Sequence, residues 1–179
     1  MKKLYALSAA LLITLALSGC GGMTSTQPTD KNMVPPASAD TKAPAEKEAT
    51  LTYYKATEDG LHILPVQTKV KAGDYTAKTA ITEMLKTDRQ SKYPILPAGV
   101  SLKSIHIEDG TATANFTKEL NQLKGETNES LFIAMTVDTL TEFPTIQRVE
   151  FRAEGKPLNF QTKMKQFKRD ESYILQEKK

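Results

Sequence analysis

Cysteine, histidine and tryptophan are scarce in this 179-residue chain, which has one cysteine, two histidines and no tryptophan. A single thiol has no partner for an intrachain disulfide, and one thiol with two imidazoles is a poor supply of zinc ligands. Basic residues outnumber acidic ones by only 24 to 21, so the concentrated positive charge of a nucleic-acid-binding protein is missing. We therefore expect no disulfide framework, no metal and no nucleic-acid partner.

Long apolar runs are also missing. The longest extends from Leu4 to Leu17, about 14 residues, and is too short to cross a bilayer core of about 30 Å as a helix. Lys2 and Lys3 precede it and small residues follow it, which is the pattern of a secretory signal peptide. We predict that residues 1–19 form such a signal.

The one cysteine lies directly after this run. The tetrapeptide LSGC, which ends at Cys20, resembles the bacterial lipobox. In signals of that kind the thiol takes a diacylglycerol, and cleavage makes the cysteine the first mature residue. Two acyl chains are enough for stable anchoring. We expect lipidation of Cys20 and a location on the extracytoplasmic face of the cell membrane. The other interpretation is a plain signal peptide with an incidental cysteine, or an uncleaved anchor.

Residues 20–49 predict a disordered tether that begins at the lipidated cysteine. The segment is rich in Thr, Ala, Pro, Lys and Glu and has few sizeable apolar side chains, so it cannot bury enough surface to offset its chain entropy. About 28 flexible residues would give a reach of roughly 30 Å. The folded part would then work a short distance from the membrane.

Alternating and helical patterns between residues 50 and 160 predict one α+β domain. The expected elements are strands at 51–56 and 61–71, a helix within 73–87, strands at 102–107 and 111–116, a helix at about 129–141, a strand at 145–153 and a short return strand at 157–160. Asp109-Gly110 suits a tight turn with positive φ, and Asp74 is a candidate cap for the first helix. We expect a single sandwich of about two helices on a mixed, mostly antiparallel sheet.

Residues 161–179 are expected to form a basic C-terminal tail or a short helix. They carry six basic and three acidic side chains. Such a segment is usually solvated, although it could attract anionic lipid headgroups or wall polymers.

Two long segments carry a family resemblance. "ILPAGVSLKSIHIEDGTATANFTKEL" and "LFIAMTVDTLTEFPTIQRVEFRAEGKPL", together with the earlier strands, resemble the bacterial sporulation and spore germination domain called GerMN over about 50–160. The resemblance implies a fold like that of ring-building motifs, a non-enzymatic envelope module and a role in the sporulation or germination of an endospore former. The family often has a Gly-Pro pair after the first helix, where this chain has "TDRQSKYPI".

The sequence shows no catalytic, cofactor-binding or metal-binding residues. His62 and His106 fall on expected strands, where surface or edge positions are the ordinary explanation. The acids next to glycines are typical of turns; they are Glu58, Asp59, Glu108 and Asp109. A GxSxG context, a phosphate loop and a Rossmann fingerprint are all missing. We therefore predict that the protein is not an enzyme.

What remains is an interaction surface. We expect an anchored scaffold or interaction lipoprotein whose partners are membrane lipid, through Cys20, and an envelope protein or a second copy of the chain, because exposed strand edges can pair with other chains. The alternative is an envelope lipoprotein that senses or binds a small ligand, which would require a pocket with convergent polar groups.

Overall fold

The computed structural model describes residues 47–175. The predicted signal peptide, Cys20 and most of the predicted tether lie outside the described residues. The first strand begins at Glu48, so the last two residues assigned to the tether belong to the folded domain instead.

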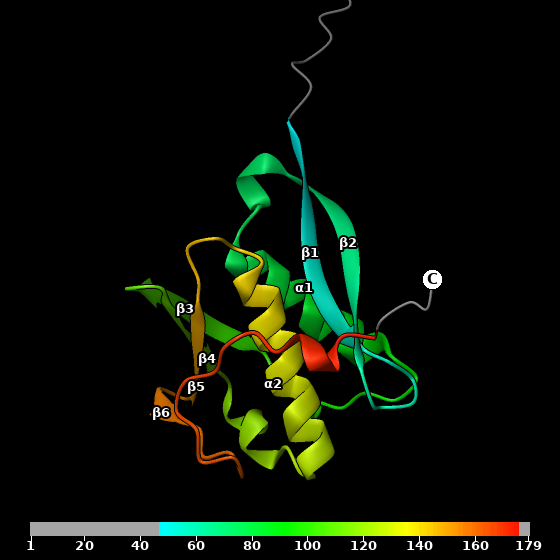
Figure 1. Cartoon of the computed structure of the whole chain (residues 1–179), viewed down its shortest axis with the longest axis vertical. Coiled ribbons are helices and arrows are strands. Elements are labelled where there is room, and N and C mark those ends of the chain that lie inside the picture. Colours follow the sequence, from blue (N-terminus) through cyan, green and yellow to red (C-terminus); the bar gives the residue numbers. More distant parts are fainter. Residues whose placement is uncertain (1–46, 176–179) are drawn as a thin grey trace, which may run out of the picture. The chain divides into compact units, whose positions relative to one another are not determined.

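The described elements alternate between short strands and two long helices (Figure 1). They are β1 (Glu48–Ala56), β2 (Ile63–Lys71), η1 (Ala72–Asp74), α1 (Ala77–Gln90), β3 (Leu102–Glu108), β4 (Thr111–Phe116), η2 (Lys118–Gln122), α2 (Glu126–Thr141), β5 (Arg148–Ala153), β6 (Lys156–Pro157) and η3 (Glu171–Tyr173). The α+β fold class is confirmed. The strands form two sheets rather than one, ordered β1-β2 and β3-β4-β5-β6. Among the described strands, β4 and β5 are the one pair that runs parallel.

The β3-β4 hairpin matches the sequence-based expectation. Asp109 has φ +47° and Gly110 has φ +72°, so both central residues of the turn occupy the left-handed region that two-residue hairpin turns require. The β1-β2 hairpin has a longer connection, and its register runs from Glu48 opposite Lys71 to Ala56 opposite Ile63.

The two helices are covered to different degrees. α1 buries one stripe, and its cap is the Thr76 hydroxyl, which accepts a hydrogen bond from the amide of Thr79 at 3.1 Å. The prediction of Asp74 as the cap was wrong, because Asp74 lies in the preceding 3-10 turn. α2 is buried almost all round between Leu131 and Leu140, because it contacts α1 and strands of both sheets. A helix that is buried on all sides carries apolar residues all round its surface rather than along one stripe.

The C-terminal segment is the largest departure from expectation. Residues 160–175, named here the C-terminal strap, cross α2 (Figure 1). Phe160 and Phe167 are buried against Phe151, with ring centroids 5.2 and 5.4 Å from it. Backbone hydrogen bonds join Phe167 to Val149 in both directions at 2.9 Å. The prediction of a solvated tail over 161–179 was therefore wrong at Phe167, whose ring completes the core together with that of Phe160 from the expected return strand.

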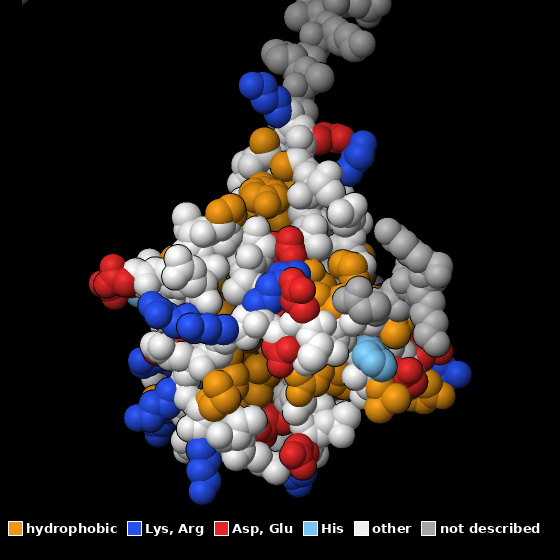
Figure 2. Space-filling model, in the orientation of Figure 1, with side chains coloured by type: hydrophobic (Ala, Val, Ile, Leu, Met, Phe, Trp, Pro, Cys, Tyr) orange, Lys and Arg blue, Asp and Glu red, His pale blue; other side chains and the backbone are white. Residues whose placement is uncertain are grey.

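The strap keeps its predicted basic character on the outside. Lys163 and Lys165 are exposed, and basic side chains gather on the side of the molecule that carries β6 and the start of the strap (Figure 2). The only helix in the strap is the three-residue η3.

Candidate functional site

The four-stranded sheet has one face against the helices and one open face. Strand alternation sorts the side chains: in β4, Ala112, Ala114 and Phe116 point into the core, while Thr111 and Thr113 point outward. β5 repeats this pattern. The open face is thus polar because the buried face of each strand takes the apolar residues.

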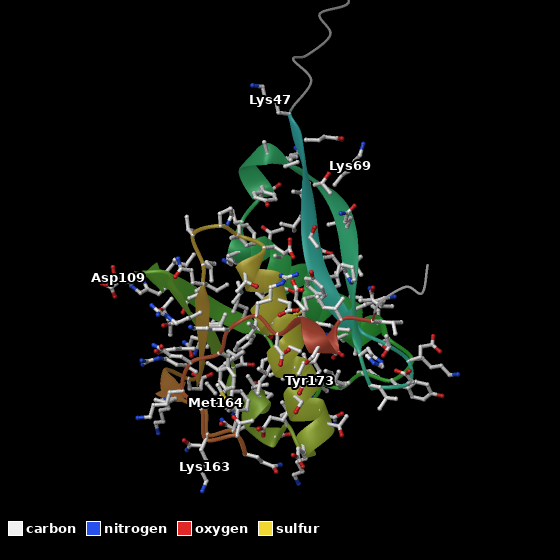
Figure 3. The ribbon with its side chains drawn as sticks, in the orientation of Figure 1. Lys47, Lys69, Asp109, Lys163, Met164 and Tyr173 are labelled. Atoms are coloured by element: carbon white, nitrogen blue, oxygen red, sulfur yellow. The ribbon has the colours of Figure 1, made fainter. Side chains whose placement is uncertain are left out.

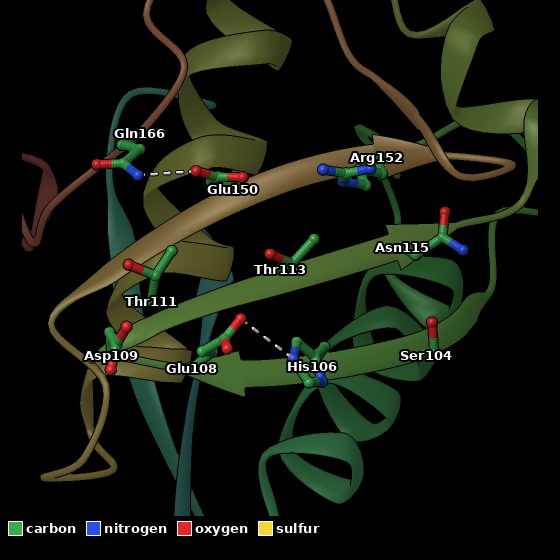
Figure 4. A pocket seen from close by; sticks show the side chains of 10 residues that line it. All are labelled: Ser104, His106, Glu108, Asp109, Thr111, Thr113, Asn115, Glu150, Arg152 and Gln166. Carbon is green, nitrogen blue, oxygen red and sulfur yellow. Dashed lines mark hydrogen bonds and ion pairs between the residues drawn. The ribbon is translucent and has the colours of Figure 1, made fainter. Parts of the chain in front are cut away.

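This open polar face forms a broad groove of about 550 Å³ (Figure 4). Its lining residues come from three strands, the β3-β4 turn and the strap; they are Ser104, His106, Glu108, Asp109, Thr111, Thr113, Asn115, Glu150, Arg152 and Gln166. Both charge signs are present, so the groove offers donors and acceptors to a polar surface.

Few of these side chains are tied to each other. Gln166 donates to Glu150 at 2.7 Å, and Nε2 of His106 lies 3.6 Å from Glu108. Asn115 accepts a hydrogen bond of 2.8 Å from the amide of Gly155. Thr111 accepts a hydrogen bond from Nε of Arg148 at 3.3 Å, and Nη1 of Arg152 donates to the carbonyl of Gly155 at 3.2 Å. Most of these bonds go to groups outside the groove lining, so few lining side chains hold one another in place.

The sequence-predicted histidines do not meet. His106 is on β3, with most of its side chain exposed. His62 was predicted to lie on a strand, and this was wrong. It lies in the connection before β2, where the backbone amide and the hydroxyl of Thr57 both donate hydrogen bonds to its carbonyl. One histidine thus lies in the β1-β2 connection and the other on the four-stranded sheet. Within residues 47–175, no three His, Cys, Asp or Glu side chains gather at a spacing suited to a metal ion.

Two of the acids next to glycines have turn roles. The carboxylate of Asp59 accepts hydrogen bonds from the Thr57 hydroxyl and the Leu61 amide. The Thr57 hydrogen bond is the largest cause that lowers the pKa of Asp59. Asp109 occupies the β3-β4 turn, and its carbonyl accepts a hydrogen bond from Arg148.

The edge of this sheet is open as well. Among the described strands, β3 pairs only with β4, so its other side presents backbone groups without a ladder partner. Ile107 of β3 is 44% exposed. An edge of this kind can accept an added strand.

Sequence reasoning missed a second polar cluster, under the strap. Asp138 of α2 is fully buried, and burial is the largest cause that raises its pKa to about 6. Arg169 of the strap contacts Glu142 at 2.9 Å and Tyr54 at 2.6 Å. The signal in the sequence was a single acid inside the apolar run "LFIAMTVDTL".

Two helices against mixed sheets give this chain an α+β fold similar to those of solved GerMN domains. The first GerMN domain of the sporulation protein GerM from Bacillus subtilis is similar, with 22% identity over 62% of this chain and 86% of that one, and a TM-score of 0.51. The structure of the tandem GerMN domains of the same protein gives 22% identity and a TM-score of 0.51. That match covers 63% of this chain and 42% of the tandem structure.

The family model described as Germane, sporulation and spore germination, matches residues 50–159. The chain belongs to this family. A search of curated proteins gave no match. In the part of the chain that the structure describes, no helix combines the length and the hydropathy needed to cross a bilayer.

Proposed function

We propose that this protein is a non-enzymatic interaction module that acts in sporulation or spore germination, held at the extracytoplasmic face of the cell membrane by lipid on Cys20. Membership of the Germane family supports the setting. The tetrapeptide that ends at Cys20 and the apolar run before it support the anchor.

The observation that carries the proposal is the open polar face together with the free edge of β3. Small-molecule sites are usually concave and bury most of their ligand, whereas this groove is broad and open over about 550 Å³. A broad, open polar face beside an unpaired edge suits another protein, which can supply both side-chain and main-chain hydrogen bonds. The occupant is an envelope protein or a second copy of this chain.

Site-specific photo-crosslinking in sporulating cells tests the interaction face. A photoreactive residue at His106 should give a discrete protein adduct. The matched control is Thr82, which is exposed on α1, and it should give none. Equal adducts from both positions, or none from either, would refute the open polar face as the interface.

Fractionation tests the anchor. Cys20→Ala should move the protein from the membrane fraction to the soluble fraction, because no diacylglycerol can be attached. Retention of this variant in the membrane would remove lipid on Cys20 from the proposal. Spore yield and germinant response in a strain lacking the gene test the setting, and normal spores would point to a general envelope role.

A further inference from the structure

A second pocket lies between α2 and the C-terminal strap. It has a volume of about 170 Å³, and both elements contribute to its walls. Its apolar walls include Ile133 and Val137 from α2 and Met164 from the strap. Met164 and Tyr173, which also line it, lie at different points along the strap (Figure 3). This pocket is separate from the open polar face and shares no lining residue with it.

Asp138 of α2 lines this pocket, and its carboxyl group is buried. Asp138 has no exposed surface, and neither of its carboxylate oxygens has a partner that meets hydrogen-bond geometry among the described residues, although the backbone amide of Asp170 acts on the group and lowers its pKa. Leaving a buried charge without a partner is costly, because the group loses its hydration and gains nothing in return. An orphan of this kind in an otherwise well-packed helix calls for an explanation.

The nearest cation does not supply the missing partner. Arg169 uses Nη1 for the backbone carbonyl of Asp138 and for the side chains of Thr141 and Glu142, and it uses Nη2 for Tyr54. Its Nε lies 3.5 Å from Glu171. The guanidinium is therefore committed to other acceptors, although its charge still lowers the pKa of Asp138.

The other charged groups around Asp138 leave the local balance negative. Asp170 and Glu142 both raise its pKa through like charge, while the Asp170 amide lowers it. Lys168 lines the same pocket but is exposed to solvent. A cation that entered the pocket would meet two carboxylates, those of Asp138 and Asp170, against one lysine at the rim.

The size and walls of the pocket define what kind of cation fits. At about 30 Å³ for each water-sized unit, 170 Å³ holds about five to six heavy atoms. The lining is mixed, since it includes apolar side chains and the two acids Asp138 and Asp170. An alkyl stem that ends in an ammonium matches both features, because the stem removes apolar surface from water while the charge is paired.

We propose that the pocket between α2 and the strap binds a primary alkylammonium group, with the ammonium at Asp138 and the alkyl stem against Ile133, Val137 and Met164. This group could come from a free amine or from a lysine side chain of a partner protein. The inference does not rest on the proposed function of the open polar face.

Titration followed by NMR tests the proposal on the full chain in detergent. n-Butylammonium chloride should give saturable shifts of the residue 130–138 amides, with a dissociation constant in the millimolar range. n-Butanol, which has the same stem without the charge, should bind at least tenfold more weakly. Equal shifts with the alcohol, or no saturable shift with the amine, would overturn the proposal.

Two variants locate the interaction. Asp138→Asn keeps the volume of the side chain but removes its charge, and should weaken the amine at least tenfold. Lys165→Ala, an exposed change on the same strap, should leave binding as in the parent chain. If Asp138→Asn fails to fold, the parent chain is titrated at pH 4, where protonation of Asp138 should abolish amine binding. Unchanged affinity in that variant or at that pH would overturn the proposal.

A lysyl peptide distinguishes the two sources of the group. Nα-acetyl-lysine amide that binds at least tenfold more tightly than butylammonium would identify a protein lysine as the natural ligand. Equal or weaker binding would identify a free amine. The Nε-acetylated peptide carries no charge and should not bind; if it binds as well as the parent peptide, the ammonium is not what Asp138 recognises.

Discussion

Nη2 of Arg169 donates a 2.6 Å hydrogen bond to the phenol oxygen of Tyr54, 115 positions earlier in the chain. The guanidinium also lies over the Tyr54 ring, 5.4 Å from its centroid. Through Nη1 the same side chain reaches Glu142 at the end of α2. One residue of the strap thus joins β1 to α2, and the strap is fastened to the domain by more than its two buried phenylalanines.

Arg169→Ala should lower the free energy of unfolding by about 1–3 kcal/mol, because Tyr54 and Glu142 lose a charged hydrogen-bond partner. This loss of stability should be smaller than that for a fully buried ion pair, because the Arg169 side chain is 29% exposed and solvent screens its charge. Urea unfolding followed by circular dichroism measures it. The exposed neighbour Lys165 serves as the control, and its alanine variant should stay within about 0.5 kcal/mol of the parent. Identical midpoints for the two variants would contradict the role of Arg169.

Asp138→Asn should become more stabilising as the pH rises. Burial raises the pKa of Asp138 from 3.8 to about 6, so the folded state holds its proton more tightly than the unfolded chain does. The stability that this proton contributes is complete below pH 3.8 and is lost as the pH rises through 6. Asparagine has no such dependence. Between pH 3.5 and 7.5 the variant should gain about 3 kcal/mol relative to the parent.

Unfolding curves of both proteins at several pH values measure this gain. A constant difference between the two proteins would mean that Asp138 keeps an ordinary pKa and is not buried as described.

Asp88 holds the loop that follows α1. One carboxylate oxygen accepts from the amide of Ile95 at 3.1 Å and the other from the amide of Leu96 at 3.2 Å. Asp88→Ala should cost about 2–3 kcal/mol, because it leaves two amides unpaired in a largely buried place. Asp88→Asn retains one acceptor oxygen and should cost less. Faster hydrogen exchange at Ile95 and Leu96 in the alanine variant would locate the effect, and unchanged exchange there would argue against it.

Phe167→Ala should destabilise the domain by about 3–5 kcal/mol, the usual cost of removing a buried phenylalanine. Its ring lies 5.4 Å from that of Phe151 and 5.5 Å from that of Phe160, centroid to centroid. Phe167→Leu fills most of the space and should cost clearly less. Chemical denaturation of the two variants gives the comparison. An alanine variant as stable as the parent would show that the strap is not part of the core.

Local signals in the sequence account for much of the fold. The turn at Asp109-Gly110 and the apolar spacing of α1 were sufficient to place the β3-β4 hairpin and the first helix. The division of the strands into two sheets depends on pairing between distant segments, such as β4 with β5, which no local pattern encodes. The strap was missed because Phe167 stands among charged residues without a period of two or of 3.6.

The candidate sites divide in the same way. The outward side chains of β4 follow from simple alternation, so the polar character of the open face could be predicted from the sequence. The environment of Asp138 was not, because an acid in a helix usually faces water, and only the strap that covers it makes it buried. The contacts of Arg169 could not be predicted for a similar reason, because the residue lies in a charged segment of a kind that is ordinarily solvated.

The register of the β1-β2 hairpin bears on how the domain would respond to mechanical force. Nine residue pairs join the two strands, with Glu48 opposite Lys71 at one end. A pull on Glu48 along the axis of β1 would load the whole ladder at once, since the inter-strand bonds lie across that direction, and the Tyr54 contact to Arg169 would share the load. A pull at right angles would open the pairs one after another, starting from Glu48. The resistance of the domain to tension should therefore depend on the direction from which a partner holds it.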